Sequence, residues 1–250
     1  MAGWVETNVN GYNVYTYDGN NWVSVNKTYA YWGAAQNDWF IYSGTTIRGL
    51  TAKYESGSPV YNNMYGYGQA DITIPNNCTA LTDSAFIRLK NVDTDTESIV
   101  IPNDTLQTLY IPDSVISLSN GAIAQCIALS SVRLPNDITK IPAMLFYCQE
   151  SYNTVLEKVT IPHNVTSFDP YVFAGCKRIK RLDFIRDTSY TGQINIQLDI
   201  FDSVITPFEM YFTCSQAEAE TLFDFGSSAY YTQQTFTAAT KYYNQVITND

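Results

Sequence analysis

Apolar residues recur at fixed distances after isoleucine–proline or leucine–proline pairs, which end at Pro75, Pro112, Pro135 and Pro162. The apolar positions lie three, six and eleven residues after each proline. In chain order the three sets are Cys78, Val115, Ile138 and Val165; Leu81, Leu118, Ile141 and Phe168; and Phe86, Ile123, Phe146 and Phe173. Four copies that keep three offsets indicate a tandem repeat, and a repeat of this length predicts a solenoid.

A spaced apolar pattern precedes each proline and predicts one strand per repeat. Leu106, Leu109 and Ile111 lead to Pro112, and the same spacing recurs at 129–134, 156–161 and, without a proline, 179–184. Proline suits the end of a strand, where its missing N–H breaks no ladder hydrogen bond. We therefore expect a solenoid over residues 69–186, with these side chains stacked on their copies above and below.

One copy departs from this spacing. Pro102 and Pro112 are only ten residues apart, so we expect that copy to be nearly all strand. The segment before it carries Asp93, Asp95 and Glu97 where other copies carry a cysteine. Hard cations prefer oxygen ligands, but the segment lacks a glycine-centred calcium loop. We expect a solvated insertion and no metal site.

Residues 1–42 are aromatic and precede a segment, 43–68, that is rich in Gly, Ser, Asn and Tyr. Asp18-Gly19 is a strong signal for a hairpin turn, and a near-copy of its surroundings follows. We expect two hairpins in a small attachment sheet, then a linker or irregular loops. The aromatic residues of the predicted attachment module are Tyr15, Tyr17, Trp22, Tyr29, Tyr31 and Trp39.

Residues 187–250 leave the repeat pattern and predict a C-terminal cap. Residues 208–212 alternate as a final strand would. Ser215 with Glu218 three residues later forms a capping box, which predicts a helix from Gln216 to about Phe225. A terminal rung needs such a cap to cover its core.

Composition excludes several classes of function. The 250-residue chain has a formal net charge of −10, which does not suit binding to a phosphate backbone. No stretch approaches the ~18 apolar residues of a membrane span. The first residues contain no basic segment followed by an apolar run, so we expect no signal peptide.

The residue types needed for catalysis are sparse. The only histidine, His163, follows Pro162 in a predicted turn, and no nucleophile elbow or phosphate loop occurs. Glu157, Asp183 and Asp187 are acids near the last predicted strands, but acids are common on an acidic surface. We expect neither an enzyme nor a cofactor.

The chain has five cysteines, an odd number that argues against a disulfide framework. Cys126, Cys148 and Cys176 fall on one column of the predicted solenoid. Side chains on one column point in parallel, so we expect small buried thiols rather than disulfides.

The polar residues between the apolar strand positions predict a continuous outward strip, with basic residues concentrated at 177–186. Such a strip offers a contact surface on which an anionic glycan or an acidic protein face could dock; a solvated end beside the cap is the alternative. The strip consists of Gln107, Thr108, Tyr110, Ser130, Ser131, Arg133, Glu157, Lys158, Thr160, Lys180, Arg181 and Asp183.

The repeats resemble a known family. Residues 161–176 read Ile-Pro-x-x-Val-x-x-Phe-x-x-x-x-Phe-Ala-Gly-Cys, which is similar to the BspA-type leucine-rich repeat. Residues 111–126 match this pattern, and 134–148 match it with one residue deleted before Cys148. The resemblance implies a mostly β solenoid with short helices, of a kind widespread in surface and adhesion proteins. It implies no catalytic motif.

The N-terminal Tyr-x-Tyr-Asp-Gly-x-x-Trp stretch, with Val23, Val25 and Lys27, resembles a short module of tailed-bacteriophage virion proteins. This resemblance implies a virion structural protein, attached to other virion proteins through residues 1–42 and located in the virion. The solenoid would then bind a host-surface glycan or protein, and a homotrimer is favoured by analogy. The alternatives are a purely structural decoration subunit of the head or tail and a bacterial surface adhesin.

Overall fold

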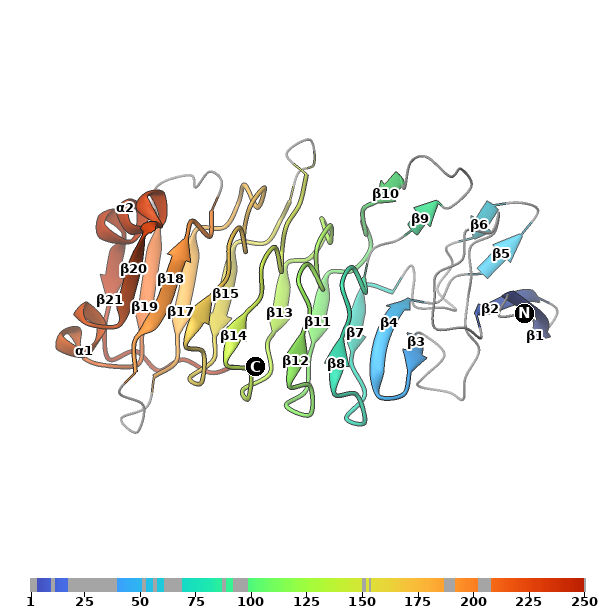
Figure 1. Ribbon diagram of the computed structural model, residues 1–250, viewed down its shortest axis with the longest axis horizontal. Helices are drawn as coiled ribbons and strands as arrows, with labels where there is room; N and C mark the ends of the chain where they lie inside the picture. Colours follow the sequence, from blue (N-terminus) through green and yellow to red (C-terminus); the bar gives the residue numbers. More distant parts are fainter. Residues whose placement is uncertain are drawn as a thin grey trace.

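The computed structural model describes residues 4–9, 12–17, 40–50, 53–55, 58–60, 69–86, 89–91, 99–149, 152, 154–186, 192–201 and 208–249. These residues form an elongated stack of short strands that runs from the N-terminal to the C-terminal part of the chain (Figure 1). Nearly all the elements are strands, with two short helices at the C-terminal end. The mostly β solenoid that the repeats predict is therefore confirmed.

Each rung of the stack contains a strand that precedes the proline, here called the A strand, and a second, shorter B strand. The A strands are β7 (Asp71–Thr73), β11 (Thr108–Tyr110), β13 (Ser131–Arg133), β15 (Lys158–Ile161), β17 (Arg181–Phe184), β19 (Glu209–Phe212) and β21 (Thr240–Tyr242). The B strands are β4 (Thr46–Leu50), β8 (Ala80–Leu81), β12 (Ser117–Leu118), β14 (Lys140–Ile141), β16 (Ser167–Phe168), β18 (Ile194–Leu198) and β20 (Phe223–Ser228).

The A strands pair in parallel and keep the register that the apolar spacing predicts. Leu109 lies between Ile72 and Val132, and Leu182 lies between Val159 and Met210. All six side chains are buried. Each inward column therefore repeats at the spacing of paired strands, about 4.8 Å, and forms a continuous core along the stack.

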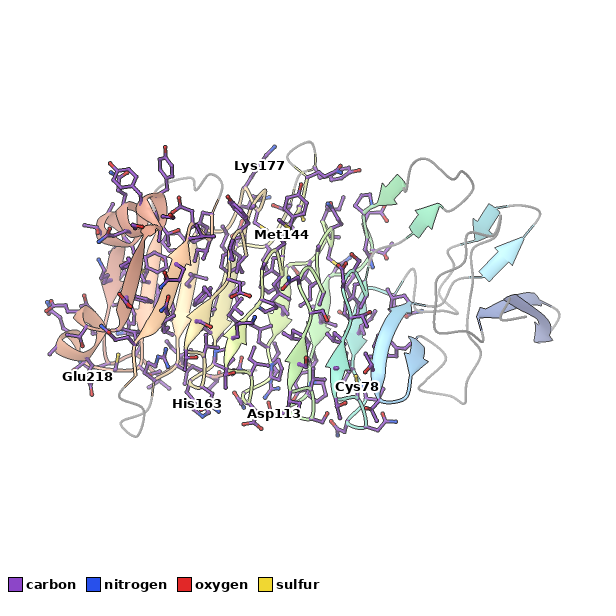
Figure 2. The ribbon with its side chains drawn as sticks, viewed as in Figure 1. Cys78, Asp113, Met144, His163, Lys177 and Glu218 are labelled. Carbon is purple, nitrogen blue, oxygen red and sulfur yellow. The ribbon has the colours of Figure 1, made fainter. Side chains whose placement is uncertain are left out.

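The residue three positions after each proline closes a turn between the two strands of a rung. The N–H of Cys78, of Val115 and of Val165 donates to the carbonyl oxygen of the proline three residues earlier, at 3.0, 3.0 and 3.2 Å. The proline carbonyl can accept this bond although proline has no N–H to donate. Figure 2 shows these turns along one long edge of the stack, marked by Cys78, Asp113 and His163.

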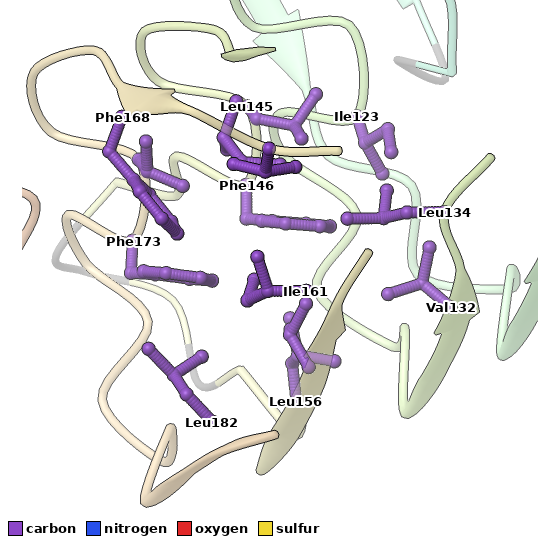
Figure 3. Packing of buried hydrophobic residues seen from close by; sticks show 14 of the residues in the cluster. Ile123, Val132, Leu134, Leu145, Phe146, Leu156, Ile161, Phe168, Phe173 and Leu182 are labelled. Atoms are coloured by element: carbon purple, nitrogen blue, oxygen red, sulfur yellow. The ribbon is translucent and has the colours of Figure 1, made fainter. Parts of the chain in front are cut away.

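The residues eleven positions after the prolines form a buried column, here called the aromatic column because three of the four are phenylalanine. The rings of Phe146 and Phe173 stack with centroids 5.5 Å apart and planes at 4°, as Figure 3 shows. Phe201 continues the column, 5.5 Å from Phe173 at 20°. Repeated stacking of this kind adds to the free energy gained by burial.

A left-handed backbone step precedes the aromatic column by two residues in each rung. Ser84, Gly121, Met144 and Tyr171 have φ angles of 56°, 64°, 57° and 59°. Only one of the four is glycine, so the stacked rungs hold three other residues in a conformation that L-residues disfavour. The amide of each is bonded to the neighbouring rung, as where Met144 N–H donates to the Pro170 carbonyl at 3.1 Å.

The N-terminal end of the stack differs from the sequence prediction. Strand β3 (Phe40–Ser43) pairs antiparallel with β4, and β4 pairs in parallel with β8. Phe40, Ile47 and Leu50 are buried in the core. Residues 40–50, which the sequence divides between an attachment module and a linker, are thus the first rung of the solenoid, and the boundary at 42/43 is wrong.

Two further hairpins precede the first long repeat. Strands β1 (Trp4–Val9) and β2 (Tyr12–Tyr17) pair antiparallel, as do β5 (Lys53–Glu55) and β6 (Ser58–Val60). The hairpin turn that the sequence predicts at Asp18-Gly19 lies outside the described residues. Tyr15 and Tyr17, which precede it, lie on the second strand of the β1–β2 hairpin. Asn10-Gly11, between β1 and β2, is the signal that finds this hairpin.

The segment before Pro102 leaves the stack. Strands β9 (Leu89–Asn91) and β10 (Ile99–Ile101) pair antiparallel as a side hairpin, so the expected copy that is nearly all strand is wrong. The chain rejoins the stack at Asn103, which bridges in parallel to Cys126. Asn103 therefore occupies the same position in its rung that Cys126 occupies in the following rung.

Asn103→Ala should destabilise the protein by about 2–3 kcal/mol, because several buried groups lose their partner. The Asn103 amide donates to the Phe86 carbonyl at 3.0 Å, and its oxygen accepts from the N–H groups of Thr105 and Leu106 at 3.1 and 3.0 Å. Urea unfolding followed by circular dichroism measures the loss. The exposed Asn120→Ala is the control, and equal losses in the two variants would contradict the role of Asn103.

The C-terminal region continues the repeat instead of forming a separate cap. Strand β19 pairs with β17, β20 with β18, and β21 with β19, all in parallel. The stack therefore does not end at the predicted boundary of 186/187. The last A strand is β21 and not the strand at residues 208–212. The sequence gives no clear signal for these rungs because they contain no Ile–Pro pair.

The capping box at Ser215 is confirmed, but its helix is shorter than expected. Helix α1 covers Gln216–Glu220, and residues 223–225, which the sequence placed in the helix, belong to strand β20. A second helix, α2 (Tyr230–Ala238), places Phe236 against the core beside Phe201 and Phe208. Among the residues described, neither helix is long and apolar enough to span a bilayer.

The end of the chain forms a strap that runs back along the stack. The N–H of Gln245 donates to the Phe212 carbonyl at 2.8 Å, and the Asn249 amide donates to the Leu134 carbonyl at 2.7 Å. Phe212 and Leu134 are three rungs apart, about 14 Å, which four extended residues can span. Figure 1 shows the C-terminus beside the middle of the stack.

Candidate contact surface

The outward residues of the A strands form two columns over the stack. The first column contains Thr108, Ser131, Lys158 and Arg181, and the second contains Tyr110, Arg133, Thr160 and Asp183. Gln107, Ser130, Glu157 and Lys180 precede the strands and are joined by backbone bonds, as where Lys180 N–H donates to the Glu157 carbonyl at 3.0 Å. Eight residues of the predicted strip therefore lie in two columns of the A strands, and the other four directly precede these strands.

Three members of the strip are buried, although the sequence places them outward. Arg133, Thr160 and Asp183 have exposed fractions of 6%, 8% and 0%. Longer neighbouring side chains fold over the second column, so outward direction does not ensure access to solvent. The accessible strip is narrower than predicted and lies mainly on the first column and on the residues before it.

Asp183 is the centre of an ionic cluster. The Arg181 guanidinium donates to both carboxylate oxygens of Asp183, at 2.6 and 3.0 Å, and Lys158 Nζ lies 2.9 Å from Oδ2. The Asp183 carboxylate raises the pKa of Arg181. Two cations thus neutralise a buried acid, and their own stems remain at the surface.

Arg181 also begins an aromatic stack that the sequence prediction missed. Its guanidinium carbon lies 3.5 Å from the centroid of the Tyr211 ring, and Tyr211 stacks on Tyr242 at 4.3 Å and 22°. Both tyrosines belong to rungs beyond residue 186, where no strip was expected. The signal was available, since residues 208–212 repeat the alternation of 180–184 at a spacing of 28 residues.

A second cation–aromatic pair lies near the middle of the stack. The Arg133 guanidinium carbon is 5.0 Å from the Tyr110 ring centroid, and Arg133 Nη1 is 2.7 Å from Asp113 Oδ1. Arg133 Nε donates to the carbonyl of Asn249 at 3.3 Å. The strap therefore helps to cover Arg133, and the Arg133 guanidinium lowers the pKa of the Asp113 carboxyl.

The basic end of the strip is partly neutralised by Glu157. Lys180 Nζ and Arg178 Nη2 lie 2.6 and 2.9 Å from its two carboxylate oxygens. The hydrogen bond from Lys180 lowers the pKa of Glu157. A carboxyl group with a lowered pKa is a poor general acid, so Glu157 does not suit the general-acid role in glycoside hydrolysis.

The remaining candidate groups offer no catalytic or metal-binding arrangement in the part of the chain that the structure describes. His163 lies in a proline turn, and its carbonyl accepts from Arg186 at 2.6 Å. No three His, Cys, Asp or Glu side chains among the described residues gather around a possible metal position. Asp93, Asp95, Glu97 and Asp187 lie outside the described residues.

The repeats match a known family. Residues 94–201 match the BspA type leucine rich repeat region, in six copies. The sequence resemblance is thereby confirmed for the repeats, and the BspA-type rungs include the strip from Gln107 to Asp183. No curated protein matches the chain.

Two solved structures are similar to this chain. A leucine rich cell surface protein from Faecalibacterium prausnitzii A2-165 has 19% identity and a TM-score of 0.40, over 62% of this chain and 35% of that one. The pneumococcal vaccine antigen PcpA has 17% identity and a TM-score of 0.45, over 72% and 42%. This chain therefore spans less than half the length of either protein.

The predicted attachment module stays a prediction. Tyr15 and Tyr17 lie on β2, whereas Trp22, Tyr29, Tyr31 and Trp39 lie outside the described residues. Neither the matched repeat family nor the two solved structures named above are described as phage proteins. Location in the virion, attachment to virion proteins and a homotrimer likewise remain untested.

Proposed function

We propose that this protein is a non-catalytic contact protein of the adhesin type, which binds a macromolecular partner along its A-strand strip. The observation that carries the proposal is the register of the strip. Polar, basic and aromatic side chains of successive rungs lie in two columns, from Thr108 on β11 to Tyr242 on β21. Stacked repeats present extended binding surfaces of this kind.

The composition of the strip suits a partner with anionic groups. The side chains of Lys158, Arg178 and Lys180 are 48%, 59% and 59% exposed. The whole chain has a formal net charge of −10, so the positive charge at this end of the strip is opposite in sign to that of the molecule as a whole. Tyr211 and Tyr242 extend it with aromatic surface, which is enriched at protein contact faces.

Binding of the full chain to an anionic surface tests the proposal. The probes are immobilised heparin and mucin, with neutral dextran as the blank, measured by surface plasmon resonance. Lys180→Glu should weaken binding about tenfold or more, because it places a second acid beside Glu157 and reverses charge at the strip.

Lys140→Glu is the matched control. Lys140 lies on B strand β14, its side chain is 53% exposed, and it pairs with Asp169 at 2.8 Å. Lys180 has the same kind of environment, with 59% exposure and a single acidic residue as partner. The control variant should bind within about twofold of the wild type. Equal loss in both variants, or no binding of the wild type to either anionic probe, would refute the proposed strip.

A further inference from the structure

Three thiols lie on successive rungs at the end of the turn that follows the aromatic column. Cys126, Cys148 and Cys176 are 5%, 2% and 2% exposed. The first two rungs meet beside Cys126 and Cys148, where the N–H of Gln149 donates to Oε1 of Gln125 at 3.3 Å. The three thiols thus lie on adjacent rungs, and the contact surface proposed above uses none of them.

Cys148 does not occupy the same backbone position as its two neighbours. Cys126 and Cys176 come three residues after the residue in the aromatic column, whereas Cys148 comes two residues after Phe146. The residue that its rung lacks corresponds to Gln125 and Gly175, which have φ angles of 61° and 76°. Cys148 therefore reaches the column without the left-handed step that its neighbours make.

This deletion presses Cys148 against the following rung. Its N–H donates to the carbonyl of Ala174 at 3.0 Å. An added Cβ on Gly175 would lie 1.8 Å from the Cys148 carbonyl oxygen. The two chains approach so closely here that only glycine fits beside Cys148.

Cys176 lies against the rung of Cys148, because its S–H donates to the Phe146 carbonyl oxygen at 3.0 Å. The neighbouring Cys176 thiol lowers the pKa of the Cys148 thiol, whereas Cys148 and burial raise the pKa of the Cys176 thiol. The thiolate is the reactive form of cysteine, so we assign Cys148 rather than Cys176 as the nucleophile of the pair.

We propose that Cys148 and Cys176 form a reversible disulfide between adjacent rungs when the protein meets hydrogen peroxide. The Cys148 thiolate attacks one peroxide oxygen, the O–O bond breaks, and the released hydroxide takes a proton to become water. The Cys176 sulfur then attacks the Cys148 sulfenic acid, and the hydroxyl leaves as water with the Cys176 proton. Two thiols and one peroxide thus yield one disulfide and two waters.

The disulfide would join two parts of the A-strand face. The A strands pair as two separate sets, β7, β11 and β13 in one and β15, β17, β19 and β21 in the other. Cys148 belongs to the rung of β13, and Cys176 to the rung of β15. The bond therefore fastens the rungs on either side of this interruption and holds the basic end of the strip to the rest.

The test treats the reduced full chain with one equivalent of hydrogen peroxide and maps its peptides by mass spectrometry without reduction. We expect a Cys148–Cys176 cross-link and a loss of about 2 Da, for the two hydrogens that the reaction removes. The midpoint of thermal unfolding should rise by about 5–10 °C and return to its starting value with dithiothreitol.

Two variants show whether the cross-link uses Cys148 and Cys176 rather than the third thiol, Cys126. Cys176→Ser should abolish both the cross-link and the thermal shift, while Cys126→Ser should keep both. A cross-link between another pair, or oxidation of Cys148 to sulfinic acid without any cross-link, would overturn the proposal. The test contains no binding partner, so its failure would leave the proposed contact function standing.

Discussion

Replacing Gly175 with alanine should destabilise the repeats by about 3 kcal/mol or more. The residue has a φ of 76°, which costs an L-residue about 1–2 kcal/mol. The added Cβ would also lie 1.8 Å from the Cys148 carbonyl oxygen and 2.8 Å from its carbon. Backbone atoms cannot move aside as a flexible side chain can, so two rungs must separate, which adds about 1–3 kcal/mol. Urea unfolding measures the change.

Gly44→Ala is the control that isolates the backbone conformation. Gly44 has a φ of 61°, and an added Cβ would meet nothing within 4 Å. Its loss of stability should be about 1 kcal/mol, from the left-handed conformation alone. If both variants lost the same amount, the close approach of Gly175 to Cys148 would have no energetic effect.

Phe146→Asp should leave most of the protein unfolded at 25 °C. Phe146 is 2% exposed and stacks on Phe173, and loss of a buried phenylalanine alone costs about 3–5 kcal/mol. An unpaired carboxylate in the same place adds a desolvation cost. The sum approaches the whole stability of an ordinary domain, about 5–15 kcal/mol. Circular dichroism and thermal melting report the loss.

Met144→Asp introduces the same charge in the same turn but on its outer side. Met144 is 43% exposed and has a φ of 57°, a conformation that aspartate tolerates better than most residues. This variant should melt within a few degrees of the wild type, roughly the effect of a surface substitution. Comparable melting of Phe146→Asp would show that the inward register of the aromatic column is wrong.

The centre of the stack was predictable from sequence because its signals are local and repeated. A proline, a turn three residues later and an aromatic residue eleven residues later describe one rung, and Val115, Val165 and Phe173 occupy the expected places. Each rung obeys the same packing rule, since it meets only its neighbours. The pattern could therefore be read without knowledge of the rest of the chain.

The ends of the stack were not predictable in the same way. Phe40 and Leu50 enter the core, although the sequence assigned Phe40 to an attachment module and Leu50 to a linker, because a terminal rung is atypical in sequence. Beyond residue 186 the rungs lose their prolines, and strand β20 stands where the capping box led us to expect a helix. Pairing with the rung before it overrides local propensity there.

The contact strip was likewise only partly predictable from the sequence. The register aligns the strand residues of the predicted strip in columns, yet Asp183 and Arg133 are buried there by Arg181, Lys158 and Asn249. Direction follows from alternation along a strand, whereas exposure depends on long side chains and on a strap from elsewhere in the chain. Tyr211 and Tyr242 joined the strip only once their rungs were known.

The sequence by itself determined the repeat, its inward columns and the absence of a recognisable catalytic motif, because spacing along the chain decides which side chains of a rung face the core. Only the tertiary structure decided where the stack begins and ends, which outward residues reach solvent, and that Cys148 lies against Gly175 and Cys176. Those features depend on contacts between residues far apart in the chain. A single deleted residue in one rung changes such contacts without changing the apolar pattern from which the fold is predicted.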